Sequence, residues 1–172
     1  MKSKTKVVVV GGGVVGVSAL YHLAKKGWSD VVLVERKELT SGSTWHAAGL
    51  VPHFIGSLNM AKVHATAPKL YAELEEETGL SAGWHSTGAI RLALSENEVD
   101  WFRYVNGMLS LVGVESHLIS PTEILDHHPL LDISDVKLGF WTPNDGWSDP
   151  TSSTNAMAKG ARQLGAEVAR HT

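Results

Sequence analysis

The stretch Val7-Val-Val-Val-Gly-Gly-Gly-Val-Val-Gly16 decides the fold of this chain. Residues 6–10 are a β-branched run without polar alternation, which predicts a strand buried on both faces of a parallel sheet. Residues 14–26 then predict a helix, with apolar positions at helical spacing at Val15, Ala19, Leu20 and Leu23. Residues 30–35 form a second apolar run. The chain therefore opens with a βαβ unit, whose crossover should be right-handed.

The glycines between strand and helix fit the pattern G-x-G-x-x-G. Gly11 allows the tight turn, Gly13 lets the backbone approach a pyrophosphate, and Gly16 lets the helix pack closely. Glu35 ends the second strand about 20 residues later, where a carboxylate accepts hydrogen bonds from a ribose hydroxyl. The pattern predicts dinucleotide binding over a merely structural turn, but it does not separate NAD from FAD.

The remaining sequence alternates between strand and helix signals. Residues 39–56 lack either period and predict a long functional loop. Ser120-Pro-Thr-Glu123 predicts a capped short helix, and Asp149 caps another that begins at Pro150. Glu75 to Glu77 are interpreted as a solvated face rather than a cation site. Helices are predicted at 68–78, 96–112 and 150–164, strands at 88–94, 115–119, 138–142 and 166–169, and a turn at 144–146.

Residues 38–50, Glu-Leu-Thr-Ser-Gly-Ser-Thr-Trp-His-Ala-Ala-Gly-Leu, closely resemble the flavin loop of the dimethylglycine and sarcosine dehydrogenases. The resemblance continues in order through residues 74–79, 88–92, 129–131, 145–146, 149–150, 160–162 and 165–166. It implies an α/β fold: a doubly wound, Rossmann-like FAD-binding domain and the start of an antiparallel-sheet substrate domain. The boundaries it implies are 1–85 for the FAD-binding βαβ unit and flavin loop, 86–142 for the substrate domain, and 143–172 for the return to the first domain.

The resemblance also implies the cofactor and the residues around it. The cofactor is FAD, linked covalently to His46 through its 8α-methyl carbon; the alternative is that His46 only hydrogen-bonds nearby backbone. A covalent bond requires a neutral, nucleophilic imidazole. Trp45 is expected to serve packing, and the other histidines have no metal-ligand spacing, so no metal is expected. The residues expected to contact FAD are Gly11, Gly13, Val14, Val15, Gly16, Glu35, Arg36, Ser43, Thr44, Trp45, His46, Gly49 and Leu50.

The implied activity is oxidative N-demethylation of dimethylglycine or sarcosine. The flavin takes a hydride from an N-methyl group, the iminium hydrolyses to formaldehyde, and electrons pass to an electron-transferring flavoprotein or to oxygen. No catalytic acid or base is identifiable, and the chain is read as a fragment or as one subunit completed by a second chain. Residues 52–59 and 147–148 depart from the family pattern, which leaves the substrate open. A non-catalytic regulatory relative and a nicotinamide-binding module remain alternatives.

Composition narrows the chemistry further. The 172 residues contain no cysteine, which excludes disulfides, iron–sulfur clusters and a cysteine nucleophile. A net charge of -3 argues against nucleic acid as a partner. No apolar run approaches the roughly 20 residues of a membrane span. The N-terminal residues show no signal peptide or presequence, so a cytoplasmic location is expected.

Overall fold

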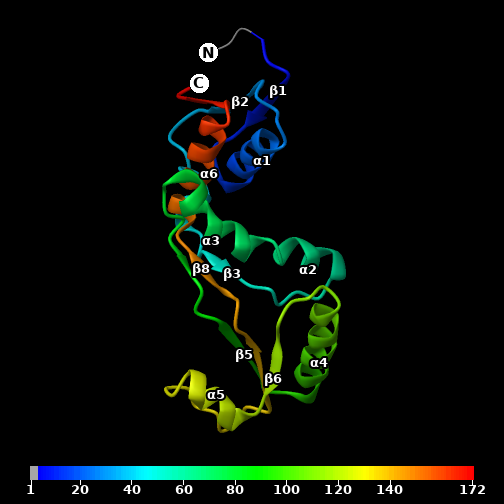
Figure 1. The fold of residues 1–172 in the computed structure, drawn as a ribbon. Helices are drawn as coiled ribbons and strands as arrows, with labels where there is room; N and C mark the ends of the chain where they lie inside the picture. The colour runs from blue at the N-terminus through cyan, green and yellow to red at the C-terminus, as the bar shows by residue number, and fades with distance from the viewer. Residues whose placement is uncertain (1–3) are drawn as a thin grey trace. The chain divides into compact units, whose positions relative to one another are not determined.

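The computed structural model describes residues 4–172, which alternate between short strands and helices (Figure 1). The strands are β1 (Val7–Val10), β2 (Val31–Glu35), β3 (Leu50–Val51), β4 (Trp84–His85), β5 (Ala89–Ala93), β6 (His117–Ile119), β7 (Leu138–Thr142), β8 (Gly146–Ser148) and β9 (Glu167–Arg170). The helices are α1 (Val14–Lys25), α2 (Leu58–His64), α3 (Ala67–Thr78), α4 (Glu96–Ser110), α5 (Pro121–His127) and α6 (Pro150–Gln163), with a 3-10 turn at Thr44–His46.

Two compact units make up the chain. The first contains the residues before Val51, together with Leu70–Trp84 and Ser148–Thr172. The second contains Val51–Lys69 and His85–Trp147. Residues 51–69, which the sequence grouped with the FAD-binding part, thus belong to the second unit.

A parallel three-stranded sheet organises the first unit, in the order β1-β2-β9. Val7 pairs with Val31, and Val32 pairs with Glu167 on the other side of β2. Because parallel neighbours need a crossover, α1 connects β1 to β2, and α6 leads into β9. The expected α/β class with an N-terminal βαβ unit is confirmed.

Helices α1 and α6 pack against each other in the core of this unit. Gly160 of α6 permits the close approach, since a Cβ there would lie 2.8 Å from Cε2 of Tyr21. The predicted apolar face of α1 was partly wrong, because Val15 and Ala19 are exposed. The face that meets α6 instead buries Val17, Leu20, Tyr21 and Ala24.

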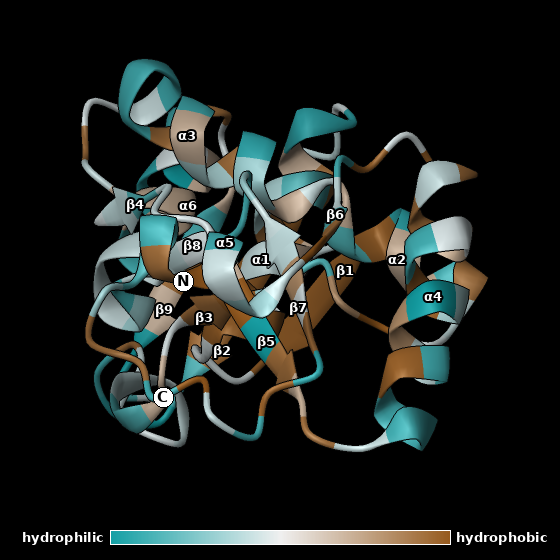
Figure 2. Cartoon of the chain, turned by 90° about the horizontal axis from the view of Figure 1, so that it is seen from below, coloured by the Kyte–Doolittle hydropathy of each residue, from teal (hydrophilic) through white to brown (hydrophobic). Residues whose placement is uncertain are grey.

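Strand β1 differs from the sequence prediction of burial on both faces. Val7 and Val9 pack against the core, but Val8 is 53% exposed and Val10 is 82% exposed. Side chains alternate between the two faces of a strand, so these two valines share the opposite face. The described residues leave β1 exposed on this face but bury Val32 of β2. The colouring in Figure 2 shows how hydrophobic β1 and β2 are.

An antiparallel sheet in the order β5-β7-β6 organises the second unit, as the family resemblance implied. Arg91 pairs with Phe140, which in turn pairs with Leu118. One hydrophobic cluster joins this sheet to α4 around Phe140, and another places Ile124 of α5 against Ile119.

Local signals fix the starts of α4, α5 and α6. Ser95 and Ser120 each form a capping box with the glutamate three residues later, and the Asp149 carboxylate accepts from Ser152 N at 2.6 Å. The sequence analysis missed α2 and the strands of the β3-β8-β4 sheet. Strands of two or three residues are too short to show a periodic pattern.

Candidate dinucleotide-binding site

The glycine loop has a backbone that larger residues cannot adopt. Gly11 has φ of +103°, and a Cβ on Gly16 would lie 2.0 Å from the Gly11 carbonyl oxygen. Gly13 precedes α1 with no side-chain cap. The first turn of α1 therefore offers backbone N–H donors and the positive end of the helix dipole to an anion.

Glu35 lies at the carboxyl end of β2, beside this loop. One carboxylate oxygen accepts from Gly12 N at 2.7 Å, and the other accepts from Lys37 N at 2.8 Å. These two backbone hydrogen bonds, with that of Gly12 the stronger cause, lower the pKa of the Glu35 carboxyl. Glu35 is thus an oriented, ionised acceptor next to the glycine turn, and neighbouring Arg36 is exposed.

Gly12 is a residue that the sequence analysis did not single out. A Cβ at this position would lie 2.6 Å from Cδ2 of Leu39 and 3.0 Å from Cγ of Glu35. The run of three glycines was the available signal, but the motif assigns roles only to Gly11, Gly13 and Gly16.

The loop after β2 is fastened to the glycine loop by hydrogen bonds. The hydroxyl of buried Thr44 accepts from Val14 N at 3.0 Å, and Thr40 N donates to Gly12 O at 2.9 Å. Thr40 holds a φ of 68°, a rare conformation for a β-branched residue, which shows how firmly its surroundings set the loop path. The structure therefore brings Thr44 next to the glycine loop, which is needed if the two loops bind one ligand. The backbone N–H of Val14 is already hydrogen-bonded to Thr44.

Two aromatic side chains of the predicted flavin loop face outward. Trp45 is 63% exposed, its ring centroid lies 5.0 Å from that of His46 in an edge-on arrangement, and His46 and Ser43 are exposed. No hydrogen bond of the His46 ring is made within the described residues. This geometry differs from the packing expected of Trp45 and leaves the imidazole of His46 accessible.

Gly49 and Leu50 complete the predicted set. Gly49 has φ of +74°, its carbonyl accepts from Ser148 N at 2.9 Å, and a Cβ there would lie 2.2 Å from the Ser148 carbonyl oxygen. Glycine is required at this close approach of two backbones. Leu50 is exposed.

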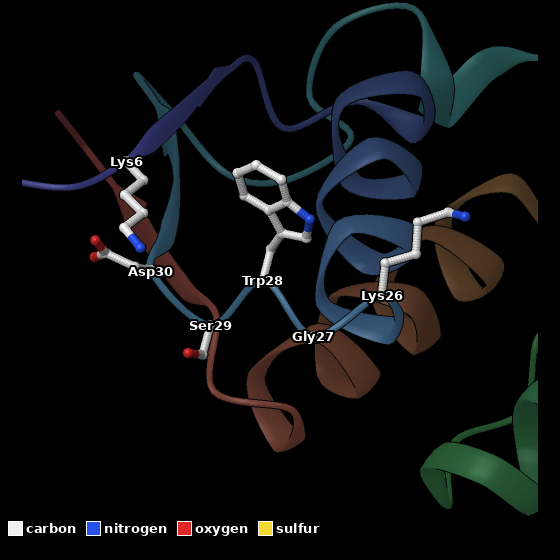
Figure 3. Close-up of a pocket in the computed structure, with 6 residues that line it drawn as sticks. All are labelled: Lys6, Lys26, Gly27, Trp28, Ser29 and Asp30. Carbon is white, nitrogen blue, oxygen red and sulfur yellow. The ribbon is translucent and has the colours of Figure 1, made fainter.

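A separate pocket of about 310 Å³ lies at the opposite end of the parallel sheet (Figure 3). Lys6 and Asp30, which precede β1 and β2, line it together with Trp28. Ligands of open α/β sheets bind beyond the carboxyl ends of the strands, whereas this pocket lies at the amino ends. It is therefore distinct from the glycine-loop site.

Within residues 4–172 no group of three or more histidines, aspartates or glutamates is placed to hold a metal ion. None of the helices in this part is both long and apolar enough to cross a membrane.

The glycine loop and Glu35 fit the ADP portion of a dinucleotide. The uncapped start of α1 suits a pyrophosphate, and the Glu35 carboxylate keeps acceptor capacity for a hydroxyl, because each oxygen has two lone pairs and uses one for a backbone N–H. This geometry alone still does not distinguish nicotinamide from flavin cofactors.

Comparison with known proteins makes that distinction. Residues 6–172 match the family described as FAD dependent oxidoreductase. The chain is 48% identical over 165 residues to human dimethylglycine dehydrogenase, mitochondrial, covering 96% of this chain and 19% of that protein. It is 39% identical over 169 residues to human sarcosine dehydrogenase, mitochondrial, covering 98% of this chain and 18% of that protein.

A solved structure supports the same assignment. L-proline dehydrogenase from P. horikoshii superposes with a TM-score of 0.91 at 33% identity, covering 99% of this chain and 45% of that one. The chain thus spans less than a fifth of the two curated relatives and under half of this structural neighbour. The family match, the two relatives and the glycine-loop geometry agree, and the chain therefore belongs to the FAD dependent oxidoreductase family.

Proposed function

We propose that the chain is the N-terminal, FAD-binding part of an oxidoreductase that oxidises N-methyl amines of the glycine type. The observation that carries this proposal is the 48% identity to dimethylglycine dehydrogenase across 96% of the chain. Similarity to sarcosine dehydrogenase supports the same substrate class, an N-methylated amino acid.

Each part of the glycine-loop site has a role in this proposal. The backbone from Gly11 to Gly16, including Val14 and Val15, holds the pyrophosphate at the start of α1. Glu35 accepts hydrogen bonds from the adenosine ribose, and Arg36 lies beside it. Bound FAD supplies the hydride acceptor for amine oxidation, while the protein binds and orients it. Residues Ser43, Thr44, Trp45, Gly49 and Leu50 form the loop along the flavin.

His46 is the proposed attachment point of the flavin. Its exposed imidazole lies in the loop that Thr40 and Thr44 fasten to the glycine loop. An accessible, neutral ring nitrogen can supply the lone pair for a bond to the 8α-methyl carbon. The fixed loop path would hold that nitrogen at a constant position relative to the glycine loop.

The proposal includes an electron acceptor, either an electron-transferring flavoprotein or oxygen, and further polypeptide to complete the enzyme. The names of the two human relatives place those proteins in mitochondria, which gives no support to the cytoplasmic location expected from the sequence. Two alternatives to the proposed function remain: a regulatory relative without turnover and a nicotinamide-binding module. The following test distinguishes the proposed function from both.

Acid precipitation tests the cofactor and its linkage together. The full-length gene product is purified, its visible spectrum is recorded, and the acid-precipitated protein band is inspected for flavin fluorescence. We expect a flavin spectrum, with fluorescence retained in the wild type and in His117→Ala, a matched exposed histidine, but lost in His46→Ala.

Three results would contradict parts of the proposal. Flavin found entirely in the supernatant, with activity intact, excludes the covalent bond but keeps FAD. A colourless protein that takes up NAD supports the nicotinamide module. A yellow protein that turns over neither dimethylglycine nor sarcosine supports the regulatory relative.

A further inference from the structure

A buried histidine–aspartate pair lies within the second unit. His53 is 5% exposed and Asp145 is 1% exposed. The His53 Nδ1 atom lies 2.5 Å from Asp145 Oδ1, and His53 N donates to the same oxygen at 2.9 Å. The Thr142 hydroxyl donates to Oδ2 at 2.6 Å. Since a carboxylate only accepts, Nδ1 donates to Asp145, and in the neutral ring Nε2 then carries the lone pair.

The Nε2 atom of His53 reaches the molecular surface. It has no hydrogen bond within residues 4–172, yet no buried side-chain nitrogen or oxygen of the described residues lacks a partner. Nε2 therefore keeps some contact with solvent, and the buried Asp145 carboxylate orients the imidazole. Proton-accepting histidines of enzymes are held in this way.

Arg91 lies over the ring of Phe54, the residue that follows His53. Its guanidinium carbon is 4.6 Å from the centroid of the Phe54 ring, which itself packs edge-on against Phe140 at 4.9 Å and Phe102 at 5.4 Å. Arg91 is exposed, and no carboxylate pairs with it in the described part of the chain. An oriented guanidinium without an acidic partner suits a carboxylate ligand, which its planar fork binds in two places.

The register of the antiparallel sheet explains why these groups meet. Ala89 pairs with Thr142 and Arg91 pairs with Phe140, and residues two apart along a strand point to the same face. One face of β5 and β7 thus carries Arg91, Phe140 and Thr142. Thr142 donates a hydrogen bond to Asp145, which in turn binds His53. Phe140 packs against Phe54, and Arg91 lies over the Phe54 ring. This face of the sheet is therefore connected to both neighbouring loop residues, to His53 through Asp145 and to Phe54 directly.

We propose that this face is a two-point site for a zwitterionic N-methyl amino acid. The Arg91 guanidinium binds the carboxylate, and His53 Nε2 takes the proton from the ammonium group. In that step the substrate N–H bond breaks, an Nε2–H bond forms, and the freed nitrogen lone pair prepares the adjacent carbon for oxidation. Asp145 is a positioning residue that fixes the ring and stabilises the imidazolium. The substrate class rests on the function proposed above.

Ligand titration of the 15N-labelled full-length gene product tests this site directly. We expect dimethylglycine to shift the Arg91 Nε–H and His53 ring signals saturably, acetate to shift only Arg91, and dimethylamine to shift only His53. Arg91→Met should weaken dimethylglycine binding by about ten- to a hundredfold, the loss expected for charged hydrogen bonds. Arg103→Met and His117→Gln, which remove exposed groups elsewhere in the unit, should bind like the wild type.

The inference is overturned if dimethylglycine moves neither signal in the wild-type chain, or if Arg91→Met binds it equally well. The wild-type titration does not depend on any variant folding. Arg91 is exposed, so its replacement leaves the buried core of the unit unchanged. Flavin uptake is measured on the same sample. Flavin binding without a dimethylglycine response overturns only this inference, whereas a response without flavin uptake overturns only the proposed function.

Discussion

At the scale of single residues, Glu35 shows how backbone donors can orient a carboxylate. Gly12 N and Lys37 N hold its two oxygens, so the carboxylate has one orientation before any ligand arrives. Pre-oriented groups lose less side-chain entropy on binding. The absence of a Cβ at Gly12 is what lets the carboxylate reach the backbone.

Replacing Glu35 tests this role in flavin binding. Glu35→Gln keeps the shape but removes the charge, and a hydrogen bond to a charged acceptor contributes roughly 1.5 to 3 kcal/mol. In a His46→Ala background, where flavin should dissociate freely, we expect the Kd for FAD to rise by about ten- to a hundredfold. Glu38→Gln, which changes a neighbouring carboxylate paired with Arg170, is the control. An unchanged Kd would remove Glu35 from the site.

At the scale of elements, a cluster of polar side chains ties α1 to α3. The Lys25 ammonium lies 2.8 Å from a carboxylate oxygen of Glu77, and the Tyr21 hydroxyl donates to the same carboxylate. The sequence analysis interpreted Glu75 to Glu77 as a solvated face, and all three residues are exposed. Glu77 differs because α1 approaches it in the folded unit.

The stability contributed by Glu77 should depend on pH. The hydrogen bond from Lys25, followed by that from Tyr21, lowers the pKa of the Glu77 carboxyl below its usual value of 4.5. A group with a lowered folded pKa stabilises the protein above its unfolded pKa, and this stabilisation is lost as pH falls through the folded pKa. Both partners are part-exposed, which limits the effect to about 0.5 to 1 kcal/mol.

Denaturant unfolding at several pH values measures this effect. Between about pH 6 and about pH 3, the wild type should lose that increment relative to Glu77→Gln, so the two curves converge at low pH. Glu76→Gln, a neighbouring exposed carboxylate, should follow the wild type. A constant difference between wild type and Glu77→Gln across this range would show that the ion pair contributes nothing measurable.

At the scale of the whole molecule, strand β1 of the parallel sheet leaves one of its two faces apolar and exposed. Val8 and Val10 together present a hydrophobic strip on β1. Parallel sheets are normally covered on both faces, and exposed apolar strips favour association. The curated relatives are more than five times as long as the matched region, so they contain further polypeptide.

Light scattering coupled to size-exclusion chromatography tests whether this hydrophobic strip causes self-association. We expect the 172-residue chain to self-associate at micromolar concentrations, and Val8→Lys with Val10→Lys to shift it toward monomer without loss of helix content. Val15→Lys, at an equally exposed valine on α1, should leave association unchanged. A monodisperse wild-type monomer would show that the open face is tolerated in water.

The sequence by itself determined the βαβ opening, the glycine turn, the capped helix starts and the family. The local features among these depend on neighbouring residues. Gly11 to Gly16 determine the path of the backbone at the turn. The side chains of Ser95, Ser120 and Asp149 accept hydrogen bonds from backbone N–H groups in the next helical turn. Such local features can be predicted from the sequence, because the groups that interact are only a few residues apart.

Only the tertiary structure decided which distant side chains meet. His53 and Asp145 are 92 residues apart, Tyr21 and Glu77 are 56 apart, and Gly12 reaches Glu35 across a helix. The open face of β1 and the inward turn of Tyr21 are likewise invisible in the hydrophobic pattern. Such contacts depend on strand register and helix packing, which the whole chain sets together through burial, so no local stretch encodes them.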